Sequence, residues 1–311
     1  MKRTAKKRLY SHVWEKEKQV ASMKFAARMS SVFSTSVFAS LASPQAGGAA
    51  SRLSVLHDLT EAHDATLTLG EAFDAAHGLL GHSYRNEYYF KNNLVSKIVL
   101  GRHSVRTASA LMEVPSGRSI ADLVIFNGTS TAYEIKTDLD SFTRLPAQLD
   151  DYSSRFEHLN VVTSIERAAE AERVTPEAVG IIGIRPNGSL SVVRPSNSGF
   201  SRLKQASIFQ LLRQKEAVEA LNRATGYEID VPSGDVWARC RSLFTALPIE
   251  VAHAEALYQL KKRGMRASAL VARTDYPASL RALAYGTEVS SSGHARIASR
   301  LAVPLTDCHR F

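Results

Sequence analysis

The segment "IADLVIFNGTSTAYEIKTDLDSF", residues 120–142, carries the strongest fold signal in the chain. Apolar and polar residues alternate on both sides of Asn127-Gly128, a dipeptide typical of short β-hairpins. Charged residues interrupt this apolar pattern: Asp122, Glu134, Lys136, Asp138 and Asp140. Such charges either line a solvated sheet edge or are presented together to a ligand.

Two registers are open for this hairpin. With a three-residue loop at 127–129, Asp122 falls opposite Glu134, and both share one face with Lys136. A two-residue loop would shift the pairing by one and place Asp122 and Glu134 on opposite faces. We favour the three-residue loop because it gathers the apolar residues better on the other face: Ala121, Leu123, Ile125, Tyr133 and Ile135.

This arrangement predicts a metal site. Two neighbouring carboxylates repel each other unless a cation lies between them, and oxygen ligands favour Mg²⁺ or Mn²⁺. Lys136 would then lie beside the metal, where it can orient a water or balance charge on a phosphate. The predicted chemistry is metal-assisted hydrolysis of a phosphodiester. The alternative, a surface ion pair with Lys136, is disfavoured because aspartate is uncommon in strands.

The wider pattern predicts an α/β domain over residues 84–195. The predicted order is a helix, a strand, the hairpin, a second helix, a short apolar strand and a second hairpin. In that order the segments are 84–100, 104–114, 120–142, 141–159, 160–164 and 178–195.

Asp122 together with Glu134-Ile135-Lys136 resembles the motif of the PD-(D/E)XK nuclease superfamily. Glu87 in "RNEYYFKN" matches the helical glutamate of that superfamily, and Gln148 with Tyr152 resembles the QxxxY element of its RecB-like branch. Ala121 stands where the name of the motif has proline. The chain also resembles an uncharacterised group of bacterial proteins with a helical N-terminal segment and a longer helical tail.

The resemblance implies a restriction-endonuclease-like core, a mixed central sheet flanked by helices in the order α-βββ-α-β, with helical N- and C-terminal regions. It implies a Mg²⁺-dependent deoxyribonuclease, with Mn²⁺ able to substitute, in bacterial DNA processing, mobile-element traffic or phage defence. The implied residues are Asp122, Glu134 and Lys136 for catalysis, Glu87, Asp122, Glu134 and the Ile135 carbonyl for metal, and Gln148 and Tyr152 for substrate. Two alternatives stay open: an inactive nucleic-acid-binding module on the same fold, and an RNA-cleaving or structure-specific nuclease.

The composition fits this interpretation. The 311 residues carry a formal net charge of +9, which favours a polyanionic partner such as DNA. No apolar run reaches the roughly 20 residues of a membrane span. Two distant cysteines, Cys240 and Cys308, form neither a disulfide framework nor a zinc site, so a cytoplasmic setting is expected. The sequence has no P-loop, which excludes an ATP-driven motor at the level of motifs. It has no Gly-x-Ser-x-Gly motif either, so a serine hydrolase has no support.

We predict three regions: a basic N-terminal extension (1–50), the nuclease-like domain (51–195) and a mainly helical C-terminal region (196–311). A secretory signal is disfavoured at the N-terminus, since "YSHVWEKEKQ" follows the basic start. A transit peptide and a phosphate-binding extension remain, and we favour the extension. The C-terminal region has no assignable motif, and substrate recognition, homodimerisation and binding of a protein partner are all open for it.

The remaining acidic residues near the hairpin have simpler interpretations. Asp138 and Asp140 are expected to make turn or cap contacts before the next helix. Asp150 and Asp151 are expected on a solvated helix face.

Overall fold

The computed structural model describes residues 21–45, 50–59, 67–100, 109–273 and 276–310. The chain divides into two compact units: Met1–Tyr89, Thr274–Leu283 and Val289–Phe311 form unit 1, and Phe90–Arg273 with Ala284–Glu288 form unit 2. The predicted boundaries at 50 and 195 do not coincide with these, because linker composition does not report which distant segments pack together. The basic start of the chain within 1–20 lies outside the described residues, as does Gly47-Gly48, a dipeptide typical of linkers.

Unit 1 is helical where the structure describes it. Helix α5 (Leu69–Ser83) begins with a capping box, in which Thr68 Oγ1 accepts from the Glu71 amide and Glu71 Oε2 accepts from the Thr68 amide. Beside α5, the Leu69 amide donates to the Val303 carbonyl at 2.9 Å, which ties distant parts of the chain together. Its other elements are residues 21–30, α2 (Thr35–Ala42), α3 (Ala50–Leu53), η1 (Ser54–His57), η5 (Ala278–Leu280), α14 (Ser291–Leu301) and η6 (Leu305–Arg310).

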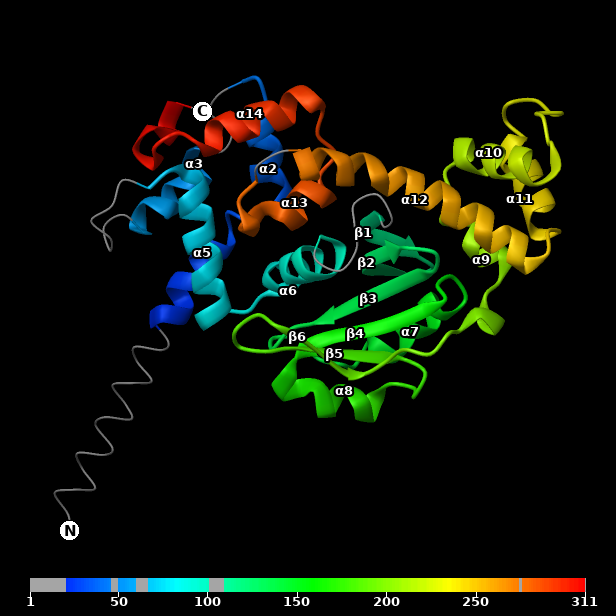
Figure 1. The fold of residues 1–311 in the computed structure, drawn as a ribbon, viewed down its shortest axis with the longest axis horizontal. Helices are drawn as coiled ribbons and strands as arrows, with labels where there is room; N and C mark the ends of the chain where they lie inside the picture. Colours follow the sequence, from blue (N-terminus) through cyan, green and yellow to red (C-terminus); the bar gives the residue numbers. More distant parts are fainter. Residues whose placement is uncertain (1–20, 46–49, 60–66, 101–108, 274–275, 311) are drawn as a thin grey trace, which may run out of the picture. The chain divides into compact units, whose positions relative to one another are not determined.

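Unit 2 is built on one six-stranded mixed sheet in the spatial order β1-β2-β3-β4-β5-β6 (Figure 1). The pairs β1–β2, β2–β3 and β5–β6 are antiparallel, whereas β3–β4 and β4–β5 are parallel. The strands are β1 (Ser109–Ser116), β2 (Ser119–Phe126), β3 (Ser130–Lys136), β4 (His158–Ser164), β5 (Gly180–Ile184) and β6 (Leu190–Arg194).

The β2–β3 hairpin has the predicted three-residue loop. Phe126 pairs with Ser130, and Gly128 adopts a φ of 102°. This left-handed conformation is accessible to glycine at little cost, which explains the Asn-Gly signal. The register prediction is therefore confirmed.

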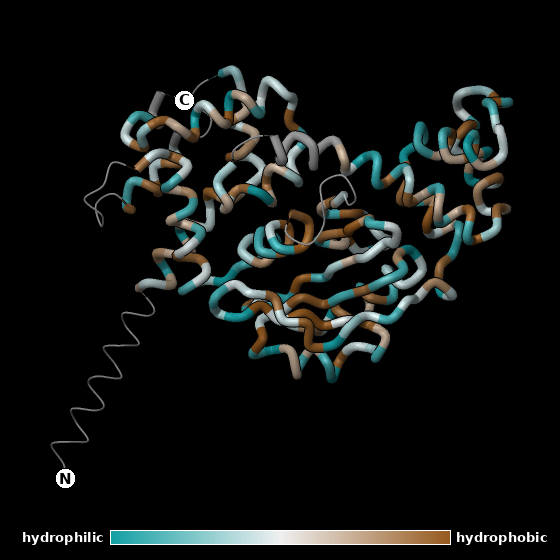
Figure 2. Tube along the Cα trace, viewed as in Figure 1, coloured by the Kyte–Doolittle hydropathy of each residue, from teal (hydrophilic) through white to brown (hydrophobic). Residues whose placement is uncertain are grey.

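Two helices cover one face of the sheet and bury its apolar side chains. Tyr152 and Leu149 of α7 (Leu145–Ser153) and Ala171 of α8 (Ala168–Val174) share a core cluster with Val124 and Phe126 of β2. Hydrophobic residues are concentrated in the central strands (Figure 2). The other helices in this part of the chain are α6 (Glu87–Leu94), η2 (Val95–Val99), η3 (Ile165–Arg167), η4 (Phe200–Arg202), α9 (Gln205–Phe209), α10 (Gln214–Thr225), α11 (Val236–Thr245), α12 (Ile249–Arg273) and α13 (Arg281–Gly286).

The C-terminal helices differ from the predicted pattern in two places. The apolar spacing over 200–226 predicts one amphipathic helix, and this prediction is wrong. Helices α9 and α10 are separate, because Glu216 Oε2 accepts from the Arg213 amide at 2.8 Å and starts a new helix there. The glycine signal at Gly264 predicts a helix end, yet α12 continues through it to Arg273.

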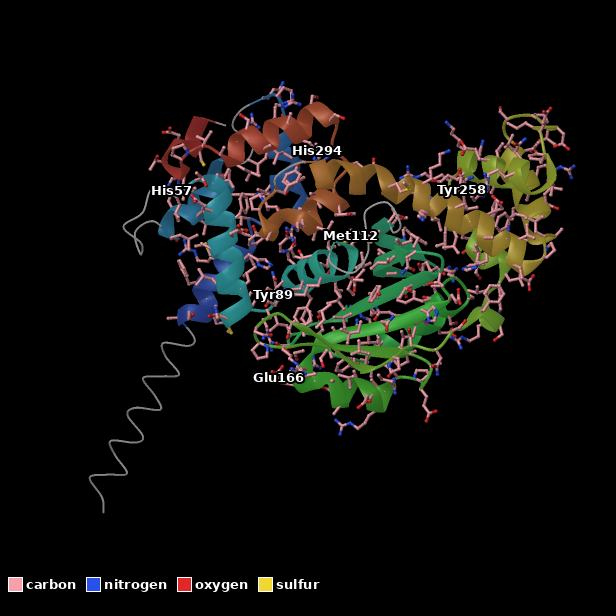
Figure 3. All side chains as sticks on the ribbon, viewed as in Figure 1. His57, Tyr89, Met112, Glu166, Tyr258 and His294 are labelled. Atoms are coloured by element: carbon pink, nitrogen blue, oxygen red, sulfur yellow. The ribbon has the colours of Figure 1, made fainter. Side chains whose placement is uncertain are left out.

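An exposed aromatic side chain on α12 is held by a neighbouring helix. Tyr258 is 46% exposed and projects from α12 (Figure 3). The guanidinium of Arg223 on α10 lies 3.8 Å from the centroid of its ring, in a cation–π contact.

The observed class is α/β, and the order helix, three strands, helix, strand is the predicted one. Within the described ranges, no helix is long and apolar enough to cross a membrane.

Gly264 makes a close approach between α12 and β1. A Cβ at this position would lie 2.8 Å from the Ala110 carbonyl oxygen, a backbone atom that cannot rotate away. We expect Gly264→Ala to lower the free energy of unfolding by about 1–3 kcal/mol, because it overpacks this contact. Urea unfolding followed by far-UV circular dichroism measures the change.

Gly78→Ala is the matched control, since a Cβ added at Gly78, inside helix α5, would meet no atom within 4 Å. It should leave the stability unchanged or raise it by up to about 1 kcal/mol through better helix propensity. Equal behaviour of the two variants would contradict the packing argument.

Candidate functional site

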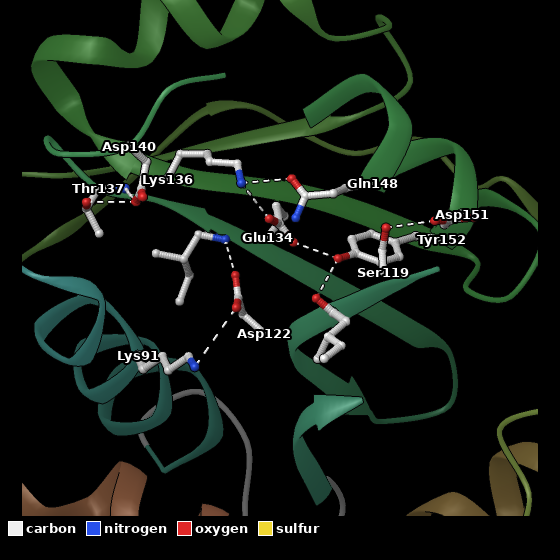
Figure 4. Close-up of polar contacts among 12 residues, drawn as sticks. Lys91, Ser119, Asp122, Glu134, Lys136, Thr137, Asp140, Gln148, Asp151 and Tyr152 are labelled. Atoms are coloured by element: carbon white, nitrogen blue, oxygen red, sulfur yellow. Dashed lines mark hydrogen bonds and ion pairs between the residues drawn. The ribbon is translucent and has the colours of Figure 1, made fainter. Parts of the chain in front are cut away.

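The site lies where the pairing of β2 with β3 ends. The ladder runs from Phe126↔Ser130 to Leu123↔Tyr133, and one further step would bring Asp122 opposite Glu134. At that step Asp122 Oδ2 accepts a hydrogen bond from the Ile135 amide at 2.7 Å (Figure 4). The carboxylate of one strand thus binds the backbone of the other, between Glu134 and Lys136.

Glu134 is 3% exposed, and both of its carboxylate oxygens accept hydrogen bonds. Lys136 Nζ donates to Oε1 at 2.8 Å, and the Tyr152 hydroxyl lies 2.8 Å from Oε2. A buried carboxylate requires such partners, because burial without them costs several kcal/mol. The two contacts fix the orientation of the Glu134 side chain.

Lys136 is 6% exposed and lies between two acceptors. Its Nζ donates to Glu134 Oε1 and to Gln148 Oε1, both at 2.8 Å. Gln148 comes from α7, so this helix sets the position of the ammonium group. The resemblance implied that Gln148 and Tyr152 face the substrate. The structure brings Gln148 to Lys136 and Tyr152 to Glu134, and contact with a substrate stays a prediction.

Tyr152 is 1% exposed, and its ring packs edge-on against Phe156. Its hydroxyl lies 2.7 Å from the Ile120 carbonyl oxygen as well as near Glu134. Burial, followed by the negative charge of Glu134, raises the pKa of this hydroxyl above its usual value. The hydroxyl therefore keeps its single proton and shares it between two acceptors. In this geometry Tyr152 positions Glu134 from inside the core.

Asp122 has a charged neighbour that the sequence did not indicate. Lys91 on α6 lies with its Nζ 3.9 Å from Asp122 Oδ1 and 3.1 Å from Glu113 Oε1. Lys91 is 8% exposed, whereas the Glu113 side chain is 65% exposed. Sequence reasoning could have found Glu113. A two-residue turn at Gly117-Arg118 between β1 and β2 places Glu113 opposite Asp122 in the β1–β2 register.

Glu87 is the first residue of α6, one helical turn before Lys91. The described contact from α6 to the Asp122 carboxylate is made by Lys91. A metal-binding role for Glu87 stays a prediction.

The other acidic residues near the hairpin have structural contacts. Asp140 Oδ2 accepts from the amide and the hydroxyl of Thr137 at 2.8 Å, which confirms its predicted turn contact. Asp150 is exposed, as expected. Asp151 was expected on the solvated face as well, but its Oδ2 accepts from the Ser119 hydroxyl at 2.7 Å and ties α7 to β2.

The predicted metal site can be compared with the grouping of His, Cys, Asp and Glu side chains in the structure. Among the residues that the structure describes, no group of three or more His, Cys, Asp or Glu side chains could hold a metal ion. The predicted donor set is the carboxylates of Glu87, Asp122 and Glu134 together with the backbone carbonyl of Ile135.

The fold and the site define an α/β protein with paired carboxylates and lysines at an interrupted strand pair of a mixed sheet. The chain belongs to the bacteriophage P4 protein cII family, whose sequence model matches residues 81–280. This match covers the whole sheet and the helices from α6 to α12.

Two similar proteins can be compared directly. Protein cII of Enterobacteria phage P4 is 32% identical over 105 residues, which are 33% of this chain and 40% of that protein. The matched part of this chain thus spans well under two thirds of that relative. A protein of unknown function from Silicibacter pomeroyi is a structural match with a TM-score of 0.31 and 14% identity, covering 46% of this chain and 94% of that chain. A TM-score this low does not establish a shared fold.

The hydroxyl of Tyr152 provides a test of the site's internal support. We expect Tyr152→Phe to lower the free energy of unfolding by about 1–2 kcal/mol, because a buried hydrogen bond to Glu134 and Ile120 is lost. Tyr227→Phe is the matched control, since the Tyr227 hydroxyl contacts Asp230 at an exposed position. Chemical denaturation of both variants should show a loss for Tyr152→Phe that is at least twice that of Tyr227→Phe, and equal losses would contradict the assigned role.

Proposed function

We propose that the protein is a metal-dependent nuclease that hydrolyses DNA phosphodiester bonds on a restriction-endonuclease-like core. One observation carries the proposal: the carboxylate of Asp122 is hydrogen-bonded to the Ile135 amide at 2.7 Å, between Glu134 and Lys136. An acidic residue of one strand and an acid-x-lysine triplet of the next are thereby held together. The order of helices and strands supports the same fold assignment.

The residues fit a divalent metal by their donor chemistry. Asp122, Glu134 and the carbonyl of Ile135 would hold Mg²⁺, or Mn²⁺ in its place, and all three supply oxygen ligands. The Asp122 side chain is 18% exposed, so a cation can reach it from solvent. When bound, the metal supplies polarisation of the phosphoryl oxygen and a lower pKa of a coordinated water.

The protein's own residues position the reacting groups. The Lys136 ammonium, already oriented by Glu134 and Gln148, would donate a hydrogen bond to the attacking water or to a phosphoryl oxygen. Tyr152 keeps the Glu134 carboxylate in one orientation. Preorganised donors of this kind stabilise charge that develops in the transition state.

The net charge of +9 supports a nucleic-acid substrate. Binding to the phosphate backbone would weaken steeply with salt. We propose a role in bacterial DNA processing, mobile-element traffic or defence against foreign DNA, in the cytoplasm. The C-terminal helices are the proposed surface for a second copy or a protein partner.

The test is cleavage of plasmid and linear DNA in Mn²⁺ by the full chain. Glu134→Gln and Lys136→Ala should each reduce cleavage by at least about 100-fold, since each removes a metal ligand or a positioned donor. Glu219→Gln is the control, because Glu219 forms an exposed ion pair with Lys262 on the C-terminal helices. It should cleave like the wild type.

Three results would change the proposal. Equal cleavage by all variants would rule out the site. Calorimetry showing no Mn²⁺ binding would favour an inactive nucleic-acid-binding module on the same fold. Cleavage of RNA in preference to DNA in a mixed-substrate assay would change the substrate class and keep the site.

A further inference from the structure

Lys91 is a nearly buried lysine that the proposed reaction does not yet use. It is 8% exposed, and its ammonium lies 3.1 Å from Glu113 Oε1 and 3.9 Å from Asp122 Oδ1. Lysine is rarely buried unless it is paired, and these two carboxylates are such partners. The ammonium group lies between a proposed metal ligand and a more exposed acid.

Glu113 reaches Lys91 through an unusual backbone conformation. Met112 pairs with Leu123 and Val114 with Ala121, so Glu113 lies opposite Asp122 in the β1–β2 register. Its φ of 52° is the one positive value at a non-glycine position in the described part of the chain. Non-glycine residues in this region cost about 1 kcal/mol or more, and such residues are concentrated at functional sites.

The formal charges of the residues joined by these contacts can be counted. We define the carboxylate–lysine network as Lys91, Glu113, Asp122, Glu134 and Lys136. Its three carboxylates and two ammonium groups give a formal net charge of −1. A divalent cation would bring the network to +1, which attracts a phosphodiester anion. Without Lys91 the loaded network would be neutral.

We propose that Lys91 and Glu113 set the charge balance of this site. They act in opposite directions on the binding of the divalent cation and on the binding of the nucleic-acid phosphate. Lys91 weakens binding of the divalent cation and strengthens binding of the nucleic-acid phosphate. Glu113 does the reverse. Both are positioning residues that act through Asp122 and through the electrostatic potential at the site. The inference rests on the proposed metal-dependent function.

A purely structural role predicts a different pattern. If Lys91 served only to hold Asp122 in place, its loss would disorder the carboxylate and weaken both the metal and the nucleic acid. A charge role separates the two affinities, because one positive charge repels the cation and attracts the phosphate.

The experiment uses the full chain with Lys91→Met, Glu113→Gln and the conservative Lys91→Arg. Isothermal titration calorimetry gives the Kd for Mn²⁺. Fluorescence anisotropy of a labelled phosphorothioate DNA duplex in saturating Mn²⁺ gives the Kd for nucleic acid with hydrolysis slowed.

Lys91→Met should bind Mn²⁺ about tenfold more tightly and the duplex about tenfold more weakly. Glu113→Gln should shift both constants by about tenfold in the opposite directions, and Lys91→Arg should stay close to the wild type. Because the Glu113 side chain is 65% exposed, its variant keeps the test decisive if Lys91→Met does not fold.

Two outcomes would overturn the inference alone: both affinities falling together in Lys91→Met, or neither affinity moving in Glu113→Gln, while the wild type binds Mn²⁺. A wild-type chain that binds no Mn²⁺ would instead overturn the proposed function, and the charge role with it. The titration of the wild type therefore distinguishes the two failures before any variant is measured.

Discussion

The site depends on one hydrogen bond, from the Ile135 amide to the Asp122 carboxylate at 2.7 Å. In an antiparallel pair each inward-facing amide requires an acceptor, and β3 loses its backbone partner on β2 after Tyr133. A charged side chain fills that position and lets the strands part without leaving a buried donor unsatisfied. The gap in the ladder is thereby stable, and its two flanking residues on β3, Glu134 and Lys136, can be engaged by α7.

The network places charge at the site and adds little to the stability of the fold. Lys136 and Glu134 are both nearly buried, and burial of an ion pair returns little or no net free energy after desolvation. Removing one partner is costly, because the other charge stays buried alone. A fold that needed stability alone would be served as well by apolar residues at these positions. The lysines act as internal counterions to the carboxylates beside them.

The sequence was sufficient wherever local rules decide the geometry. The loop at 127–129 fixed the β2–β3 register, and the i, i+4 spacing of Gln148 and Tyr152 placed both on the site side of α7. Lys91 was not predicted, because its contacts depend on how α6 packs near β1 and β2. The continuation of α12 through Gly264 was missed for the same reason, since there glycine serves a close approach to β1 and does not end the helix.

The division of the chain has a consequence for the order of events during synthesis. Unit 2 is almost contiguous, so its sheet can assemble once residue 273 has left the ribosome. Unit 1 requires segments from early and late in the chain, as in the pairing of Leu69 with Val303, and cannot be completed until the later segment is made. The N-terminal helices therefore lack their C-terminal partners, α14 and η6, until those segments have been translated. A truncation before residue 276 would leave the carboxylate–lysine network within an intact stretch of chain but deprive the N-terminal helices of their partners.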